Sequence, residues 1–308
     1  MKHRLATCTV GLLVGSYLIV VASVVATPSQ QPRSVAAAAQ AKRRLVWVDR
    51  QGKEELLAAP PRAYGLPRLS PDARRIAVEI GPPWDLWIYN IADNSLVQFT
   101  SDGNTRFPLW TPDGKRVVFG SVSGPGNVFW KAADGSGAPE RLAASEHPLG
   151  PQSWSPDGKI LSFYEIHPQT GRDIWMLPMQ GERKPWVFLR TPALEGGAVF
   201  SPDGHWLAYI SDESGSRQVY VQPFPGPGER RQVSVGGGVE PMWAHTGREL
   251  FFRDGDKRMS VEIVTEPALS VGLPKVLFEA PFQNSPGTRA NYDVAPDDRR
   301  LLMVRAEP

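Results

Sequence analysis

The stretch Trp154-Ser155-Pro156-Asp157-Gly158-Lys159-Ile160-Leu161-Ser162-Phe163 reads as the end of one β-strand, a tight turn and the beginning of the next strand. Proline fixes φ near the value that a turn requires, and aspartate can accept hydrogen bonds from the N–H groups of the turn. Glycine adopts the positive φ that lets the chain reverse its direction. This stretch therefore predicts a β-hairpin.

The same turn recurs along the chain. Measured at the turn proline, or at the histidine that replaces it once, the copies lie at positions 71, 112, 156, 202, 245 and 296, which are 41, 44, 46, 43 and 51 residues apart. A strand-rich repeat of about 40 to 50 residues is typical of β-propeller blades, each a four-stranded sheet. We therefore predict an all-β protein with six blades. The other copies are Leu69-Ser70-Pro71-Asp72-Ala73, Trp110-Thr111-Pro112-Asp113-Gly114, Phe200-Ser201-Pro202-Asp203-Gly204, and the weaker Trp243-Ala244-His245-Thr246-Gly247 and Val294-Ala295-Pro296-Asp297-Asp298.

Each interval contains the same further parts. An apolar strand follows the turn, and most copies then have a third strand with a central aromatic residue, such as Asp173-Ile174-Trp175-Met176. A polar turn leads to an outer strand, for example Glu140-Arg141-Leu142. Because the aromatic residues occur once per blade in the same register, we expect them to pack between neighbouring blades rather than to stack on bases or sugars.

The sixth blade is incomplete at the C-terminus, where only one strand follows the last turn. Residues 45–49 match the pattern of a third strand, and residues 54–57 fit an outer strand. We predict that residues 45–57 complete the sixth blade and close the ring, which removes open sheet edges. The fifth blade departs most from the pattern, and its longer segment 267–278 predicts an insertion within that blade rather than a separate domain.

The N-terminal part divides the chain into three regions. Residues 1–26 begin with basic residues and continue as an apolar run, which predicts a signal peptide or a transmembrane anchor that would include residues 5–26. Residues 27–44 are a linker rich in proline, alanine and glutamine, and residues 45–308 are the propeller. We expect the propeller to be periplasmic or otherwise extracytoplasmic, either secreted or anchored to the inner membrane.

Composition argues against nucleic acid as a partner and offers no cysteine or metal chemistry in the propeller. The chain has 34 Lys and Arg against 32 Asp and Glu, so its net charge of +2 gives no electrostatic basis for binding nucleic acid. The only cysteine, Cys8, lies in the apolar N-terminal run, and the histidines show no spacing typical of a metal site. We expect no cofactor, no metal ion and a monomeric propeller.

The repeated Trp-Ser-Pro-Asp-Gly turn, followed by Asp173-Ile174-Trp175-Met176, resembles the WD40-like PD40 repeats of TolB-type six-bladed propellers. The resemblance covers residues 45–308 and extends to the extracytoplasmic propellers of some bacterial Ser/Thr kinases, although the kinase motifs are absent from this sequence. It implies a periplasmic binding or scaffolding surface with protein or peptide partners. It implies no particular ligand, because one fold carries many functions.

A catalytic apparatus is not recognisable in the sequence. The segment Gly120-Ser121-Val122-Ser123-Gly124 places valine where a hydrolase elbow requires its serine. We therefore predict a non-enzymatic protein-interaction or ligand-sensing module. Two alternatives stay open: a propeller hydrolase of the lactonase type with a metal ion at the channel mouth, and a relic of a longer sensor kinase.

The sequence positions most open to function lie at the start of the inner strands, around the predicted central channel. Two arginines, two glutamates and two amides facing one funnel would suit a polar peptide or a small molecule. A competing and more economical interpretation is that these side chains form salt bridges or contact water at the rim. The six residues are Arg68, Arg106, Gln152, Glu195, Glu240 and Asn291.

Overall fold

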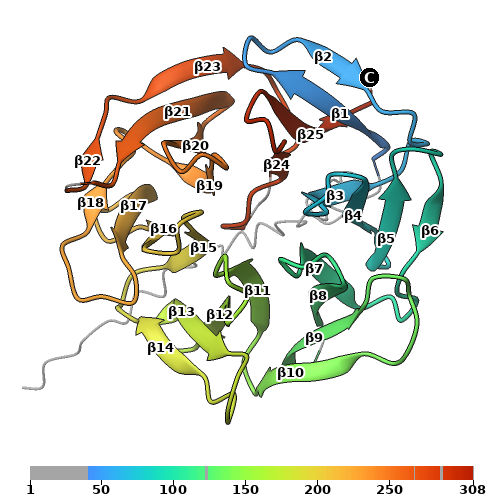
Figure 1. The fold of residues 1–308 in the computed structure, drawn as a ribbon, viewed down its shortest axis with the longest axis horizontal. Coiled ribbons are helices and arrows are strands. Elements are labelled where there is room, and N and C mark those ends of the chain that lie inside the picture. Colours follow the sequence, from blue (N-terminus) through green and yellow to red (C-terminus); the bar gives the residue numbers. More distant parts are fainter. Residues whose placement is uncertain (1–40, 122–123, 267, 285–286, 308) are drawn as a thin grey trace, which may run out of the picture.

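The computed structural model describes residues 41–121, 124–266, 268–284 and 287–307. They form a ring of six antiparallel sheets around a central channel, so the predicted six-bladed β-propeller is confirmed (Figure 1). The described part of the chain contains no helix that is long and apolar enough to cross a membrane. The predicted signal peptide or anchor, and the linker up to residue 40, lie outside the described residues.

Each blade has four strand positions from the centre outward, and we number the blades 1 to 6 in the order of their inner strands. The inner strands are β3 (Tyr64–Leu69), β7 (Thr105–Trp110), β11 (Leu149–Trp154), β15 (Glu195–Phe200), β19 (Val239–Trp243) and β24 (Tyr292–Val294). The second strands are β4 (Arg75–Ile80), β8 (Arg116–Ser121), β12 (Ile160–His167), β16 (Trp206–Ser211), β20 (Glu249–Asp254) and β25 (Arg300–Ala306). The third strands are β5 (Asp85–Asn90), β9 (Gly126–Ala132), β13 (Gly171–Pro178), β17 (Gln218–Pro223), β21 (Lys257–Val264) and β1 (Arg43–Asp49). The outer strands are β6 (Leu96–Gln98), β10 (Glu140–Ser145), β14 (Trp186–Leu189), β18 (Arg231–Gln232), β22 (Ser270–Val271) with β23 (Lys275–Glu279), and β2 (Glu54–Leu56).

Blade 6 joins the two ends of the propeller, as predicted. Strand β1 pairs with β25 along its whole length, with Trp47 opposite Leu302, and β2 pairs with the outer edge of β1 (Figure 1). Strand β1 begins at Arg43, two residues before the boundary expected at residue 45. The backbone of Arg43 pairs with that of Ala306 and forms an isolated bridge to Arg62, so the strand extends into the expected linker.

Blade 5 carries its extra residues at the outer edge. Strands β22 and β23 both pair with β21, one beyond the other along the same strand. The longer segment predicted around residues 267–278 therefore stays within the blade and divides its outer position into two short strands.

The recurrent turn is held by its own side chains. In blade 3, Ser155 Oγ donates a hydrogen bond to Asp157 at 2.7 Å and accepts one from the Ile160 N–H at 2.9 Å. Asp157 also accepts the Lys159 N–H at 3.1 Å, and Gly158 has a φ of +70°. The hydrogen bond from Ser155 is the largest of the interactions that lower the pKa of Asp157 to about 2. The aspartate therefore has a structural role, which is to stabilise the turn.

Blade 5 lacks this aspartate, and a carboxylate from the neighbouring blade accepts two other N–H groups of its turn. Asp298, in the turn of blade 6, accepts the backbone N–H of His245 at 2.7 Å and that of Thr246 at 3.1 Å. The carboxylate that supports the blade 5 turn thus comes from the next blade around the ring.

The buried side chains of the described residues form six hydrophobic clusters, one between each pair of neighbouring blades. The cluster between blades 2 and 3, for example, joins Val118 and Trp130 to Leu161 and Phe163, and Trp175 packs against it. The aromatic residues of the third strands thus contribute to packing between blades, as expected. The core of the molecule is a set of interfaces arranged in a ring.

The tryptophan before the turn adds a polar contact between blades. Trp110 Nε1 of blade 2 donates to the carbonyl oxygen of Arg68 in blade 1 at 2.9 Å. Trp243 Nε1 of blade 5 donates to the carbonyl oxygen of Val199 in blade 4 at 3.2 Å. The buried Nε1 of Trp154 has no hydrogen-bond partner among the described residues.

Replacement of Trp110 by phenylalanine should therefore destabilise the protein more than the same change at Trp154. Both indoles are buried, but only Trp110→Phe removes a hydrogen bond, which contributes about 1 kcal/mol net. The phenyl ring keeps an aromatic face toward the Arg75 guanidinium, whose Cζ lies 4.6 Å from the Trp110 ring centre. We expect the free energy of unfolding, measured by urea titration, to fall by about 1 kcal/mol more in Trp110→Phe. Equal losses in the two variants would show that the bond between blades contributes nothing.

Candidate functional site

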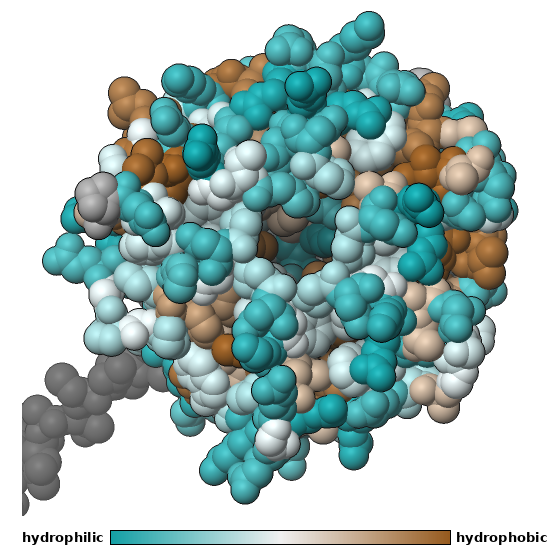
Figure 2. All heavy atoms as spheres, viewed as in Figure 1, coloured by the Kyte–Doolittle hydropathy of each residue, from teal (hydrophilic) through white to brown (hydrophobic). Residues whose placement is uncertain are grey.

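The central channel contains a cavity of about 400 Å³. Part of its lining comes from the recurrent turns, including Ser70, Pro71, Thr111 and Pro112, so the cavity lies toward the face that carries these turns. The face drawn in Figure 2 is hollowed at the centre of the ring, with both hydrophilic and hydrophobic atoms in the hollow. The channel thus offers a concave site of the size of a small-molecule pocket.

One equivalent residue from each blade lines this cavity. It is the second-last residue of the inner strand, three positions before the turn proline or before His245. We call these six residues the cavity ring. In blades 2, 4 and 5 its members are apolar, whereas blades 3, 6 and 1 contribute polar or charged side chains. The members are Arg68, Leu109, Ser153, Val199, Met242 and Asp293.

The inner strands contain an irregularity next to the cavity ring. Their pairing with the second strands shifts register in blades 1 to 5. In four of these blades the residue five positions before the turn proline or His245 has a positive φ, and these residues are Leu66, Phe107, Gly197 and Glu240. Because a bulge of this kind redirects the following side chains, it helps to set which residues face the cavity.

Arg68 and Asp293 join blades 1 and 6 at the cavity. The guanidinium of Arg68 donates to the carbonyl oxygens of Pro67 at 2.7 Å, Ala290 at 2.8 Å and Tyr292 at 3.1 Å. Asp293 accepts the Leu69 N–H at 2.8 Å and the Val294 N–H at 3.0 Å. Burial raises the pKa of the Asp293 carboxyl, and the charge of Arg68 opposes this effect.

The chain before β24 enters the channel and reaches blade 4. We call residues 287–290 the plug segment, and Figure 1 shows the chain before β24 at the centre of the ring. A Cβ atom on Gly197 would lie 2.5 Å from the carbonyl oxygen of Thr288, so a side chain there would displace this segment. Thr288 Oγ1 also accepts a hydrogen bond from Arg172 at 2.8 Å. The plug segment is thus held between blades 3, 4 and 6.

The plug segment carries a buried arginine that lines the cavity. Arg289 is 5 % exposed, and none of its three guanidinium nitrogens has a hydrogen-bond partner among the described residues. Its Cζ lies 5.1 Å from the centre of the Phe107 ring. Burial, reinforced by the charge of Arg68, lowers the pKa of Arg289 to about 9, so the group stays protonated at neutral pH. The cavity therefore contains a positive charge without a hydrogen-bonded counter-ion in the described structure.

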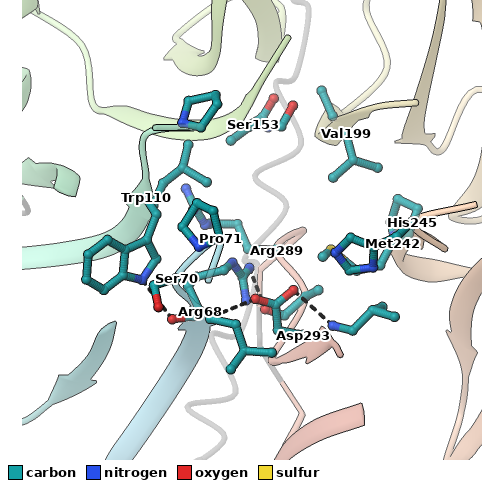
Figure 3. A pocket seen from close by; sticks show the side chains of 18 of the residues that line it. Arg68, Ser70, Pro71, Trp110, Ser153, Val199, Met242, His245, Arg289 and Asp293 are labelled. Atoms are coloured by element: carbon teal, nitrogen blue, oxygen red, sulfur yellow. Dashed lines mark hydrogen bonds between the residues drawn. The ribbon is translucent and has the colours of Figure 1, made fainter. Parts of the chain in front are cut away.

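Gln152 is a second buried polar group on the cavity wall. It is 6 % exposed, and neither its amide nitrogen nor its amide oxygen has a partner among the described residues. Figure 3 shows the site, with Arg68 and Trp110 on one side of the cavity and Val199, Met242 and His245 on the opposite side. Unpaired buried polar groups each cost about 1 to 3 kcal/mol of stability, and the presence of two of them makes this cavity the candidate site.

Two of the six residues predicted from the sequence, Arg68 and Gln152, line the cavity. Arg106 instead binds Glu79, with Nη2 and Oε2 2.7 Å apart, and its Cζ lies 4.0 Å from the centre of the Trp84 ring. The Nε and Nη2 atoms of Arg106 both donate to Glu79, so its guanidinium links blade 2 to blade 1.

The other three are also engaged in contacts within the fold. Glu240 is buried between Arg253 at 3.1 Å and Arg258 at 3.4 Å. Asn291 accepts the Leu66 N–H and donates to the carbonyl oxygen of Gln283, both at 2.7 Å. Glu195 accepts a hydrogen bond from Thr191, while its Oε2 has no partner among the described residues. A role of these residues in binding stays a prediction.

Asp293, Arg289, Ser153 and the apolar members of the cavity ring were not predicted from the sequence. The ring could have been found by counting back three residues from every turn proline and from His245. Arg289 lies seven residues before the last turn proline, where the other blades carry different residues, so the repeat pattern gives no signal for it. Within the described residues, no group of three or more His, Cys, Asp or Glu side chains is placed to hold a metal ion.

Replacement of Glu195 by glutamine should change how stability depends on pH. Burial raises the pKa of Glu195, so ionisation of the folded protein is unfavourable. The contribution of neutral Glu195 to wild-type stability is then fully present below the ordinary glutamate pKa. It is lost as pH rises through the higher pKa of the folded state. We expect the melting temperature of Glu195→Gln, relative to wild type, to increase between pH 4 and pH 7.

Glu229→Gln provides the matched control, because the Glu229 side chain is 86 % exposed and its removal relieves no burial. If Glu195→Gln and Glu229→Gln gave the same pH dependence, the burial of Glu195 would not be the cause.

Comparison with known proteins identifies the fold. No family model matches the chain. The structure is similar to that of a protein assigned as TolB from Agrobacterium tumefaciens, with 18 % sequence identity, a TM-score of 0.72, and coverage of 87 % of this chain and 99 % of that one. It is also similar to TolB from Acinetobacter baumannii, at 19 % identity and a TM-score of 0.59, with 76 % of this chain matching 65 % of the other. A protein assigned as a 6-phosphogluconolactonase from Bacteroides uniformis has 15 % identity and a TM-score of 0.53, with 86 % and 89 % covered. The chain thus has the six-bladed β-propeller fold of the TolB type.

Proposed function

We propose that this protein is a non-enzymatic binding propeller that acts outside the cytoplasmic membrane and receives a ligand or a segment of a partner protein in its central cavity. The observation that carries this proposal is the pair of buried polar side chains, Gln152 and Arg289, without hydrogen-bond partners among the described residues. A bound partner would supply the missing hydrogen bonds and offset the cost of burying these groups.

The composition of the cavity supports binding through one defined surface. Apolar side chains of Leu109, Val199 and Met242 face the channel together with a few polar groups, which is the usual arrangement of a ligand pocket. Of the residues expected at the channel mouth, we propose that Arg68 and Gln152 contribute to this surface.

The proposed location rests on the apolar segment 5–26 and on the resemblance to TolB-type propellers, which implies a periplasmic setting with protein or peptide partners. The even balance of charge gives no reason to propose nucleic acid as a partner.

The proposal can be tested by filling the cavity. Val199→Trp would place an indole in the cavity ring, and Met242→Trp would do so from the next blade. We expect a partner captured from an extracytoplasmic extract by the wild-type protein to be lost from both variants. Val97→Trp is the matched control, because Val97 is 61 % exposed on the outer strand β6.

The comparison is informative only between folded proteins, so melting temperatures and elution volumes of the variants are measured in parallel. If both cavity variants remain folded and retain the partner to the same extent as Val97→Trp, binding through the central cavity is refuted.

The lactonase-type alternative makes a different prediction about metal. A hydrolase of that kind would hold Ca²⁺ or Zn²⁺ at the channel mouth through converging carboxylate, amide or histidine side chains. We expect elemental analysis of the purified full chain to find less than one such ion per molecule after dialysis. A stoichiometric ion whose removal abolished hydrolysis of a lactone would favour the enzyme.

A further inference from the structure

We infer that the partner presents a carboxylate and that the guanidinium of Arg289 binds it inside the cavity. This inference rests on the proposed function, since it specifies the chemistry of the group that the cavity receives. It is carried by the burial of Arg289, by the lack of a hydrogen-bond partner among the described residues, and by its position on the cavity wall.

The nearby acidic side chains are already engaged. Glu79 binds Arg106 and also accepts the backbone N–H of Phe107 at 2.8 Å. Both carboxylate oxygens of Asp293 accept backbone N–H groups. The negative charge that would complement Arg289 is therefore best supplied from outside the described structure, because a buried charge without a partner is unfavourable.

A carboxylate fits this site better than a neutral polar group. The planar guanidinium offers parallel N–H donors that match the two oxygens of a carboxylate. Arg68 adds a second positive charge to the same cavity, although its hydrogen bonds are directed to backbone carbonyl oxygens. The amide of Gln152 provides a further donor. Even with the carboxylate of Asp293 counted, the two arginines leave the lining with a net positive charge, which favours an anion.

The apolar part of the lining indicates what is attached to the carboxylate. Leu109, Val199 and Met242 present apolar surface in blades 2, 4 and 5. A volume of about 400 Å³ accommodates a small apolar body next to the charged group. Two sources provide this chemistry: a free small carboxylic acid, and the C-terminal carboxylate of a protein chain that ends in an apolar residue.

Isothermal titration of the full chain distinguishes these sources. One arm uses 3-phenylpropanoate and its primary amide, and the other uses the peptide acetyl-Gly-Gly-Phe with a free or an amidated C-terminus. We expect at least one of the two acids to bind at least tenfold more tightly than its own amide. Binding of the small acid alone assigns a free carboxylic acid, and binding of the peptide acid alone assigns a chain terminus.

The Arg289→Met variant tests the residue itself. It should weaken binding of the acid at least tenfold, to the level of the amide, while the unliganded variant melts at the same or a higher temperature than wild type, because an uncompensated buried charge has been removed. Arg299→Met is the matched control: it makes the same change of charge at an exposed position of the blade 6 turn and should retain the preference for the acid.

The carboxylate assignment and the proposed function fail in different ways. Equal binding of acid and amide, abolished by Val199→Trp, overturns the carboxylate and leaves binding in the cavity intact. Absence of binding by both acids, or an acid preference that survives in Arg289→Met, also overturns the assignment of Arg289. Only partner capture that is insensitive to both Val199→Trp and Met242→Trp refutes the proposed function.

Discussion

The structure depends on the burial of each blade against its two neighbours. The described residues have no single central core, because the hydrophobic side chains gather in six clusters between adjacent blades. Burial of apolar surface contributes roughly 25 cal/mol per Å², and a blade at the end of an open row would leave one face without this gain. Pairing of β1 with β25 removes that end, so the ring gains its last interface by combining segments from opposite ends of the propeller.

Closure of the ring also determines the site. It brings the six inner strands together around one axis, and their equivalent second-last residues form the cavity ring. Because the blades repeat the same backbone, a chemical difference between the copies becomes an asymmetry of the cavity. Blades 6 and 1 contribute Asp293 and Arg68, and the plug segment adds Arg289, whereas blades 2, 4 and 5 contribute apolar side chains. The cavity lining is therefore chemically asymmetric around the ring.

The fold could be predicted from the sequence because its signals are local. In the recurrent turn, Ser155 and Asp157 satisfy N–H groups only a few residues away, so the same residue types recur wherever the same turn forms. The site was harder to predict from the sequence. Arg68 and Gln152 were found, but Arg106 and Glu240 form ion pairs whose partners lie on other strands, and the sequence does not show these pairings.

Arg289 could not have been identified by comparing repeats, because the equivalent position, seven residues before the turn proline, carries a different residue type in each of blades 1 to 4. Its guanidinium is distinguished by the lack of a hydrogen-bond partner in the described surroundings, which only the folded chain reveals.

The support of the blade 5 turn by Asp298 has a consequence for the repeats as building blocks. A fifth blade that was duplicated, transplanted or recombined without the sixth would lose the carboxylate that accepts two N–H groups of its turn. The visible repeat of the sequence is therefore not the smallest portable module of this protein, because at this point the module comprises two consecutive blades.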